Sequence, residues 1–121
     1  MIHHVNRQIP PSTLDQCVRF YGLLGFKPVP APEAVAGRAV WLEAAATQVH
    51  LMPAADAQPD RGHVAVVVSD YEAVLAELRM AGHEVESRRK HWGSPRAFVH
   101  DPIKTRSTSS PAIGMPGVKP I

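Results

Sequence analysis

Two stretches of the chain repeat one pattern of apolar and polar positions. Each begins with a strand of alternating character, at 2–9 and again at 63–68. Each strand is followed by apolar residues at helical spacing, which define the buried side of a helix. These residues are Leu14, Cys17, Val18 and Tyr21 in the first stretch, and Tyr71, Val74, Leu75 and Leu78 in the second. The pattern predicts one structural unit used twice.

Both predicted helices have start and stop signals. Each start has the spacing of a capping box, in which two side chains satisfy free backbone amides of the first turn. The capping pairs are Thr13 with Gln16 and Ser69 with Glu72. Gly25 and Gly82 follow the helices and predict their ends, because glycine readily adopts the left-handed conformation of a helix C-terminus.

The remaining strands complete two modules of the same element order. We expect strands at 26–29, 39–43 and 48–52 in module one, and at 84–87 and 96–100 in module two. Module one then covers 1–58 and module two 59–110, with 53–61 as the linker. Alternation places polar residues on one strand face in each case. The residues expected on these faces are His4, Asn6 and Gln8, then Gln48, His50 and Met52, and finally His63 in module two.

The repeat weakens after Pro102. From there to the end, 11 of 20 residues are Pro, Gly, Ser or Thr, and apolar alternation is lost. Such a segment buries little apolar surface to offset its loss of conformational entropy. We therefore expect the final strand, at 104–109, to be weak or missing, and 111–121 to be an irregular tail.

Composition excludes several classes of function. The formal charge of +2 is too small for a nucleic-acid partner, and the basic run Arg88-Arg89-Lys90-His91 is typical of a solvated loop. No run of about 18 apolar residues is present, so no membrane span is predicted. Cys17 is the only cysteine, which excludes an internal disulfide and is compatible with a reducing cytosol. We expect a cytoplasmic protein.

Three histidines are the candidate chemistry. His4, His50 and His63 all fall on strand faces opposite the apolar residues expected beneath the helices. Three inward imidazoles suit Zn, Ni, Fe or Cu. The alternative is that they are separate histidines, each bonded to its own neighbours in a polar cavity. Trp41 and Trp92 are candidates for lining a pocket, although packing explains them equally well.

The order of these motifs resembles a known family, the vicinal-oxygen-chelate superfamily. That group includes glyoxalase I, bleomycin- and fosfomycin-resistance proteins and extradiol dioxygenases. The landmarks in module one are His4-Val5-Asn6 and Phe20-Tyr21-Gly22-Leu23-Leu24-Gly25-Phe26. Those in module two are Gly62-His63-Val64-Ala65 and Phe98-Val99-His100-Asp101-Pro102.

The resemblance implies an α+β fold in which two βαβββ modules form a curved mixed sheet around a cavity. It also implies a homodimer and a divalent metal, Zn, Ni, Fe or Mn, held by the first and fourth strands of each module. Carried over residue by residue, those ligand positions are His4, His50, His63 and Thr108.

The chain departs from the family at its acidic positions. Glyoxalase I typically has glutamate at the positions of His50 and Thr108, and extradiol dioxygenases have one at the latter. His50 and Glu43 are the remaining candidates for a base, although the favoured interpretation of Glu43 is the solvated end of a hairpin. The resemblance thus implies a metalloprotein of lyase, isomerase or dioxygenase type acting on a small molecule. The alternative is a binding protein of the drug-resistance type, without catalysis.

Overall fold

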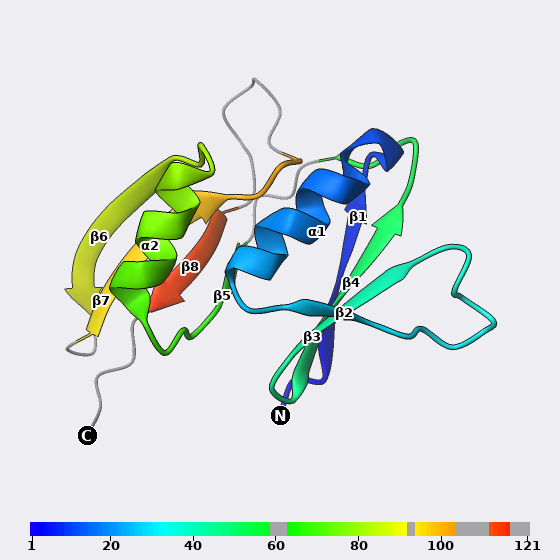
Figure 1. Cartoon of the computed structure of the whole chain (residues 1–121), viewed down its shortest axis with the longest axis horizontal. Coiled ribbons are helices and arrows are strands. Elements are labelled where there is room, and N and C mark those ends of the chain that lie inside the picture. Colours follow the sequence, from blue (N-terminus) through cyan, green and yellow to red (C-terminus); the bar gives the residue numbers. More distant parts are fainter. Residues whose placement is uncertain (59–62, 92–93, 104–111, 117–121) are drawn as a thin grey trace. The chain divides into compact units, whose positions relative to one another are not determined.

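The structure, a computed structural model, describes residues 1–58, 63–91, 94–103 and 112–116. It is an α+β fold with two compact units, Met1–Gln58 and Pro59–Ile121. Among the described residues, each unit contains one α-helix and one four-stranded mixed sheet (Figure 1). Both units have the predicted βαβββ order, which confirms the expected fold class.

Unit one, Met1–Gln58, has its sheet in the order β1-β4-β3-β2. Its elements are β1 (His4–Ile9), a short 3-10 helix η1 (Pro11–Thr13), α1 (Leu14–Leu23), β2 (Lys27–Val29), β3 (Val40–Ala44) and β4 (Thr47–Pro53). β1 and β4 are parallel, whereas β3 is antiparallel to both of its neighbours. The opening and closing strands of the unit are therefore adjacent in space.

The core of unit one lies between α1 and one face of this sheet. Phe20 and Cys17 on α1 are fully buried, as are Ile9, Leu42 and Leu51 on the strands. Period-two alternation puts these strand residues on the face opposite His4 and His50. The helix α1 thus covers the apolar face of the sheet, and the polar face lies on the side opposite α1.

The start of α1 differs from the predicted capping box. The Thr13 hydroxyl donates to the carbonyl of Pro10 at 2.7 Å, and Thr13 makes no side-chain cap to the helix. The Pro10-Pro11 segment explains the difference, because it winds the chain into η1 before α1 begins. Gly25, with a φ of 98°, ends the helix as predicted.

Unit two, Pro59–Ile121, repeats the arrangement with the sheet order β5-β8-β7-β6. Its elements are β5 (His63–Ala65), α2 (Tyr71–Met80), β6 (Val85–His91), β7 (Ser94–His100) and β8 (Ala112–Pro116). β5 and β8 are parallel, and β7 is antiparallel to β6 and β8. Leu75 and Leu78 of α2 and Val99 of β7 are buried in the core.

The cap of α2 lies one residue later than predicted. Asp70, not Ser69, is the N-cap, and its carboxylate accepts a hydrogen bond from the amide of Ala73 at 3.2 Å. Aspartate is among the strongest N-cap residues, and its charge also favours the positive end of the helix dipole. Gly82 ends α2 with a φ of 92°.

The last strand of unit two differs most from the sequence-based expectation. Ala112–Pro116 form β8, inside the segment expected to be an irregular tail. Backbone pairing with β5 and β7 explains the strand, since it satisfies amides and carbonyls on both sides. The sequence places this final strand at 104–109, and those residues lie outside the described ranges. β6 also extends through His91, where a polar loop was expected.

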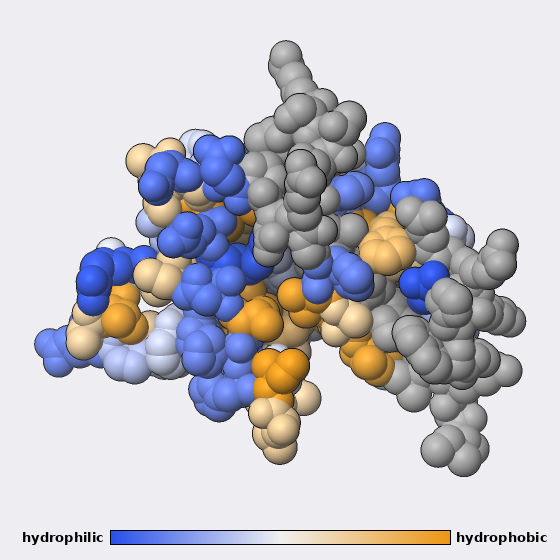
Figure 2. Space-filling model, turned by 180° about the vertical axis from the view of Figure 1, so that it is seen from behind, coloured by the Kyte–Doolittle hydropathy of each residue, from blue (hydrophilic) through white to orange (hydrophobic). Residues whose placement is uncertain are grey.

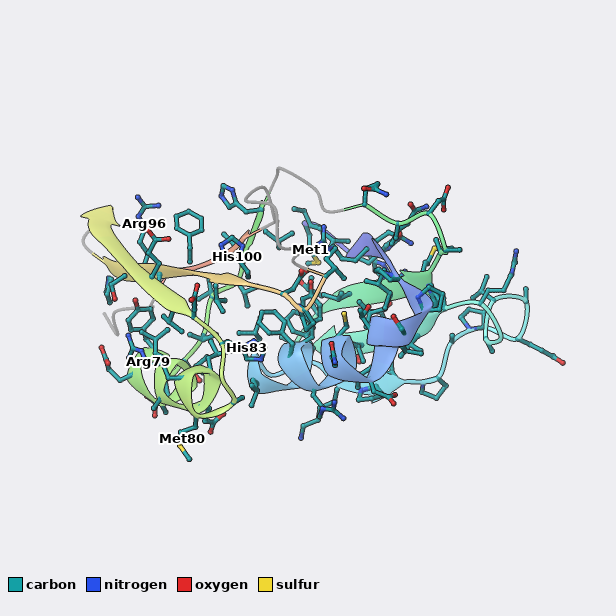
Figure 3. All side chains as sticks on the ribbon, turned by 90° about the horizontal axis from the view of Figure 1, so that it is seen from above. Met1, Arg79, Met80, His83, Arg96 and His100 are labelled. Atoms are coloured by element: carbon teal, nitrogen blue, oxygen red, sulfur yellow. The ribbon has the colours of Figure 1, made fainter. Side chains whose placement is uncertain are left out.

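Hydrophilic and hydrophobic residues are interspersed on the surface of the described residues. Figure 2 shows hydrophilic residues with smaller hydrophobic groups between them. Met80 is 88% exposed and extends from the last turn of α2 into solvent (Figure 3). Within the ranges given above, no helix has the length and apolar character needed to cross a membrane.

Candidate binding site on the polar sheet face

The polar face of the unit-one sheet collects side chains from its strands. Strand register pairs His4 with Gln48, Asn6 with His50, Trp41 with His50, and Glu43 with Gln48. Paired residues share a face, so all of these side chains stand on the side opposite α1. The sequence correctly predicts that His4 and His50 share this face.

Three aromatic rings stack across this face. The ring centroids of His4 and His50 are 4.1 Å apart with an interplanar angle of 16°. Those of Trp41 and His50 are 4.0 Å apart with an angle of 4°. β4 lies between β1 and β3, so His50 is the middle ring. We call His4, His50 and Trp41 the ring stack.

A chain of hydrogen bonds runs beside the ring stack. Gln48 Nε2 donates to Glu43 Oε1 at 3.2 Å, and Gln48 Oε1 lies 2.8 Å from His50 Nε2. Glu43 is half-buried and engaged through this bond, so it differs from the solvated hairpin end weighed as an alternative. Both residues considered as a base thus contact Gln48.

Burial favours the neutral form of the His50 imidazole. Its residue is only 6% exposed. Desolvation lowers the pKa of His50 below its ordinary value, and the nearby rings of His4 and His3 lower it further. A neutral histidine has one nitrogen that donates and one that accepts a hydrogen bond or binds a metal.

His3 lies closer to the ring stack than the sequence indicates. Strand alternation predicts that it points away from His4. In the structure the two Nδ1 atoms are 3.0 Å apart and the rings meet edge to face, with centroids 5.2 Å apart. The reason is that β1 begins only at His4, so strand alternation does not govern His3. His3 is exposed, as expected of a surface residue.

Unit two offers a different set of groups at the equivalent positions. His63 begins β5 and is exposed, and its ring meets Phe98 of β7 edge to face at 5.4 Å. On β1, Asn6 follows His4 by two residues and pairs with His50 of β4. On β5, Ala65 follows His63 by two residues and pairs with Gly114 of β8. The fourth-strand position therefore belongs to Gly114, which has no side chain to act as a ligand.

This register corrects the assignment of Thr108 to the fourth-strand position. A constant sequence offset assigns Thr108, but β8 begins at Ala112, beyond it. Thr108 and Trp92 themselves lie outside the described residues. Neither Thr108 nor Gly114 is acidic, so the departure from the family's glutamate holds under both assignments.

Metal donors are sparse in the part of the chain that the structure describes. No group of three or more His, Cys, Asp or Glu side chains there is arranged to hold a metal ion. Unit one brings together two candidate ligands, His4 and His50, and the third, His63, belongs to unit two. In His50, moreover, Nε2 is occupied by Gln48. The ring stack and its hydrogen bonds alone do not make a metal centre.

Sequence reasoning names Trp41 as a pocket-lining candidate and places Gln48 on the polar face, but it misses the contacts of both side chains with His50. A usable signal was present in the hairpin of β3 and β4. Its short turn fixes an antiparallel register that sets Trp41 opposite His50 and Glu43 opposite Gln48. Side chains directly opposite each other on one face lie within contact distance.

The fold and this site define a class: α+β proteins with two βαβββ units and a polar sheet face that carries histidines. A model of the Glyoxalase/Bleomycin resistance protein/Dioxygenase superfamily matches residues 1–106, and the chain belongs to this superfamily. The match confirms the resemblance noted in the sequence. A search of curated proteins found no match.

Solved structures share the fold over nearly the whole chain. A putative glyoxalase family protein from Bacillus anthracis has a TM-score of 0.83 and 24% identity, over 98% of this chain and 95% of that one. An antibiotic binding protein from a Streptomyces species has a TM-score of 0.72 and 18% identity, over 98% and 96%. A lactoylglutathione lyase from Agrobacterium tumefaciens has a TM-score of 0.68 and 16% identity, over 97% and 92%. At these identities the likeness establishes the fold.

Proposed function

We propose that this protein binds a small, partly aromatic molecule on the polar sheet face of unit one. The observation that carries the proposal is the ring stack of His4, His50 and Trp41 beside the hydrogen-bonding groups of Gln48 and Glu43. Small-molecule sites typically combine aromatic surface with a few well-placed polar groups. The fold is also that of an antibiotic binding protein.

Binding without catalysis is the favoured form of this function. A general base must reach the proton that it removes. Glu43 and His50 each have a polar atom committed to Gln48, and the acidic residue of the family's enzymes is missing. These contacts support a sequestering role, in which the protein holds its ligand and leaves it unchanged.

A thermal-shift screen tests this proposal. Aromatic antibiotics, catechols and dicarbonyl compounds are added one at a time, without metal. A ligand present at about 100 times its Kd stabilises the folded protein by about 2.7 kcal/mol. We expect at least one aromatic compound to raise Tm, and Trp41→Ala to abolish the rise. Gln8→Ala, on the same face but outside the ring stack, is the control and retains it. A hit whose shift survives Trp41→Ala contradicts the proposed site.

A metal site is the second candidate, with His4, His50 and His63 as ligands. It is favoured by the two imidazoles that β1 and β4 bring together, and by His63 at the position of β5 that matches His4 on β1. A divalent Zn, Ni, Fe or Mn ion bound there would act as a Lewis acid for glyoxalase-type or dioxygenase-type chemistry. Metal content after purification tests it. Stoichiometric metal that is lost in both His4→Ala and His63→Ala supports this candidate, and unchanged metal in both variants excludes it.

Two further properties stay predictions. The family resemblance implies a homodimer, and the lone Cys17 is compatible with a cytoplasmic location.

A further inference from the structure

Both faces of the His50 ring are covered by other rings. Trp41 stacks on one face of its ring and His4 on the other, at centroid distances of 4.0 and 4.1 Å. A ligand therefore cannot stack on His50 without displacing one of these rings. It can reach His50 only at a ring atom on the edge.

One of the two edge nitrogens is already engaged. The direction of the hydrogen bonds follows from Glu43, because a carboxylate at neutral pH accepts and does not donate. The amide nitrogen of Gln48 therefore faces Glu43, at 3.2 Å, and its carbonyl oxygen faces His50 Nε2, at 2.8 Å. A carbonyl oxygen only accepts, so His50 Nε2 must donate its hydrogen.

We propose that Gln48 is a positioning residue that fixes the tautomer of His50, with the hydrogen on Nε2 and the lone pair on Nδ1. Nδ1 is then the nitrogen that His50 offers to a ligand. The ligand class follows: a molecule that presents a hydroxyl or an N–H to His50 rather than a carboxylate or a phosphate. This last step rests on the proposed function, whereas the tautomer itself does not.

The charges around His50 agree with this assignment. The titratable groups that face it are His4 and His3 from β1 and its start, and Glu43 from β3 through Gln48. Gln48 Oε1, 2.8 Å from His50 Nε2, fixes the position of the hydrogen, and desolvation, which lowers the pKa of His50, favours the uncharged ring in the same sense. Glu43 acts on the ring through Gln48 by holding the amide in one orientation.

Nuclear magnetic resonance of the imidazole nitrogens tests the tautomer directly. Long-range proton–nitrogen correlation spectra of the ¹⁵N-labelled full chain at neutral pH distinguish the two neutral forms, and His50→Gln assigns the signals. We expect the Nε2–H form in the unsubstituted protein. Gln48→Lys replaces the acceptor with a donor that still pairs with Glu43, and we expect it to switch His50 to the Nδ1–H form. Gln48→Glu retains an acceptor and should retain Nε2–H.

The outcomes separate this proposal from the proposed function. Gln8→Lys adds the same charge to the same sheet face, away from His50, and should leave the tautomer unchanged. An Nδ1–H form in the unsubstituted protein, or Nε2–H that persists in Gln48→Lys, overturns the role of Gln48. If Gln48→Lys does not fold, the tautomer of His50 in the unsubstituted protein and in Gln48→Glu still tests the proposal. No ligand is needed, so a negative ligand screen counts only against the proposed function.

Discussion

At the residue scale, the site depends on how one histidine is surrounded. His50 has a ring on each face and an amide at Nε2, and it is nearly excluded from solvent. Each contact restricts what the ring can do. Stacking restricts the plane of the ring, the hydrogen bond restricts its rotation, and burial favours its neutral form. These restraints agree with the proposed role of His50 in ligand binding.

Burial of His50 predicts a specific dependence of stability on pH. Its pKa is lowered from the ordinary 6.5 in the folded chain, so the unfolded chain binds a proton that the folded chain does not. The free energy of unfolding therefore falls as pH drops below about 6.5. We expect Tm to fall on acidification, and the fall to be smaller in His50→Gln.

His83 requires its own control in that experiment, because burial lowers its pKa in the same direction. His83→Gln should reduce the dependence of stability on pH by the contribution of His83 alone, and the contribution of His50 should remain. Equal slopes for His50→Gln and the unsubstituted protein in urea or heat unfolding would show that His50 is not held neutral by the fold.

The sequence predicts part of this arrangement. Strand alternation places His4 and His50 on one face, because a period of two depends only on local backbone geometry. It does not show that Trp41 covers His50 or that Gln48 bonds to it. Those contacts depend on the register between strands, which is set by the turn and by long-range pairing.

At the element scale, the helix starts show how local signals compete. Two capping boxes are predicted, and neither starts its helix as expected. Thr13 donates to Pro10 because the prolines impose a 3-10 turn, and Asp70 takes the cap that Ser69 was expected to provide. Neighbouring Ser and Asp are both good caps, so sequence alone does not decide between them.

The α2 cap gives a prediction with a matched control. Asp70→Ala removes the acceptor for the Ala73 amide and should lower the free energy of unfolding by about 0.5–2 kcal/mol. Ser69→Ala changes the adjacent residue, which provides no cap, and should have a much smaller effect. Urea unfolding measures both. A larger loss in Ser69→Ala would restore the capping box as the start of the helix.

The local sequence does not predict the closing strand of unit two, β8. Ala112–Pro116 contain a glycine and end in proline, both of which are depleted in strands. β8 forms because its backbone can pair with β5 on one side and with β7 on the other. Such pairing depends on tertiary context, which outweighs the weak propensity of these residues.

At the scale of the whole molecule, the repeat in the sequence predicts the order of elements in both units. The element order, the helix ends at Gly25 and Gly82, and the family are all confirmed. The units differ in their chemistry. The fourth strand of unit one provides His50, whereas the equivalent position of unit two is Gly114. The two units therefore share one order of elements and differ in the residues at equivalent strand positions.

The homodimer is a prediction at this scale. Light scattering coupled to size-exclusion chromatography measures mass directly, and we expect twice the mass of the chain at micromolar concentration. A mass of one chain across the accessible range of concentration contradicts the prediction.

Mapping where a ligand binds tests whether the ring stack is the binding site. Backbone amide signals of the ¹⁵N-labelled protein are recorded during titration with the strongest aromatic hit from the screen. We expect the largest shift changes on β1, β3 and β4 around His4, Trp41 and His50, and we expect Trp41→Ala to remove them. Changes confined to other elements, with these strands unaffected, would contradict it.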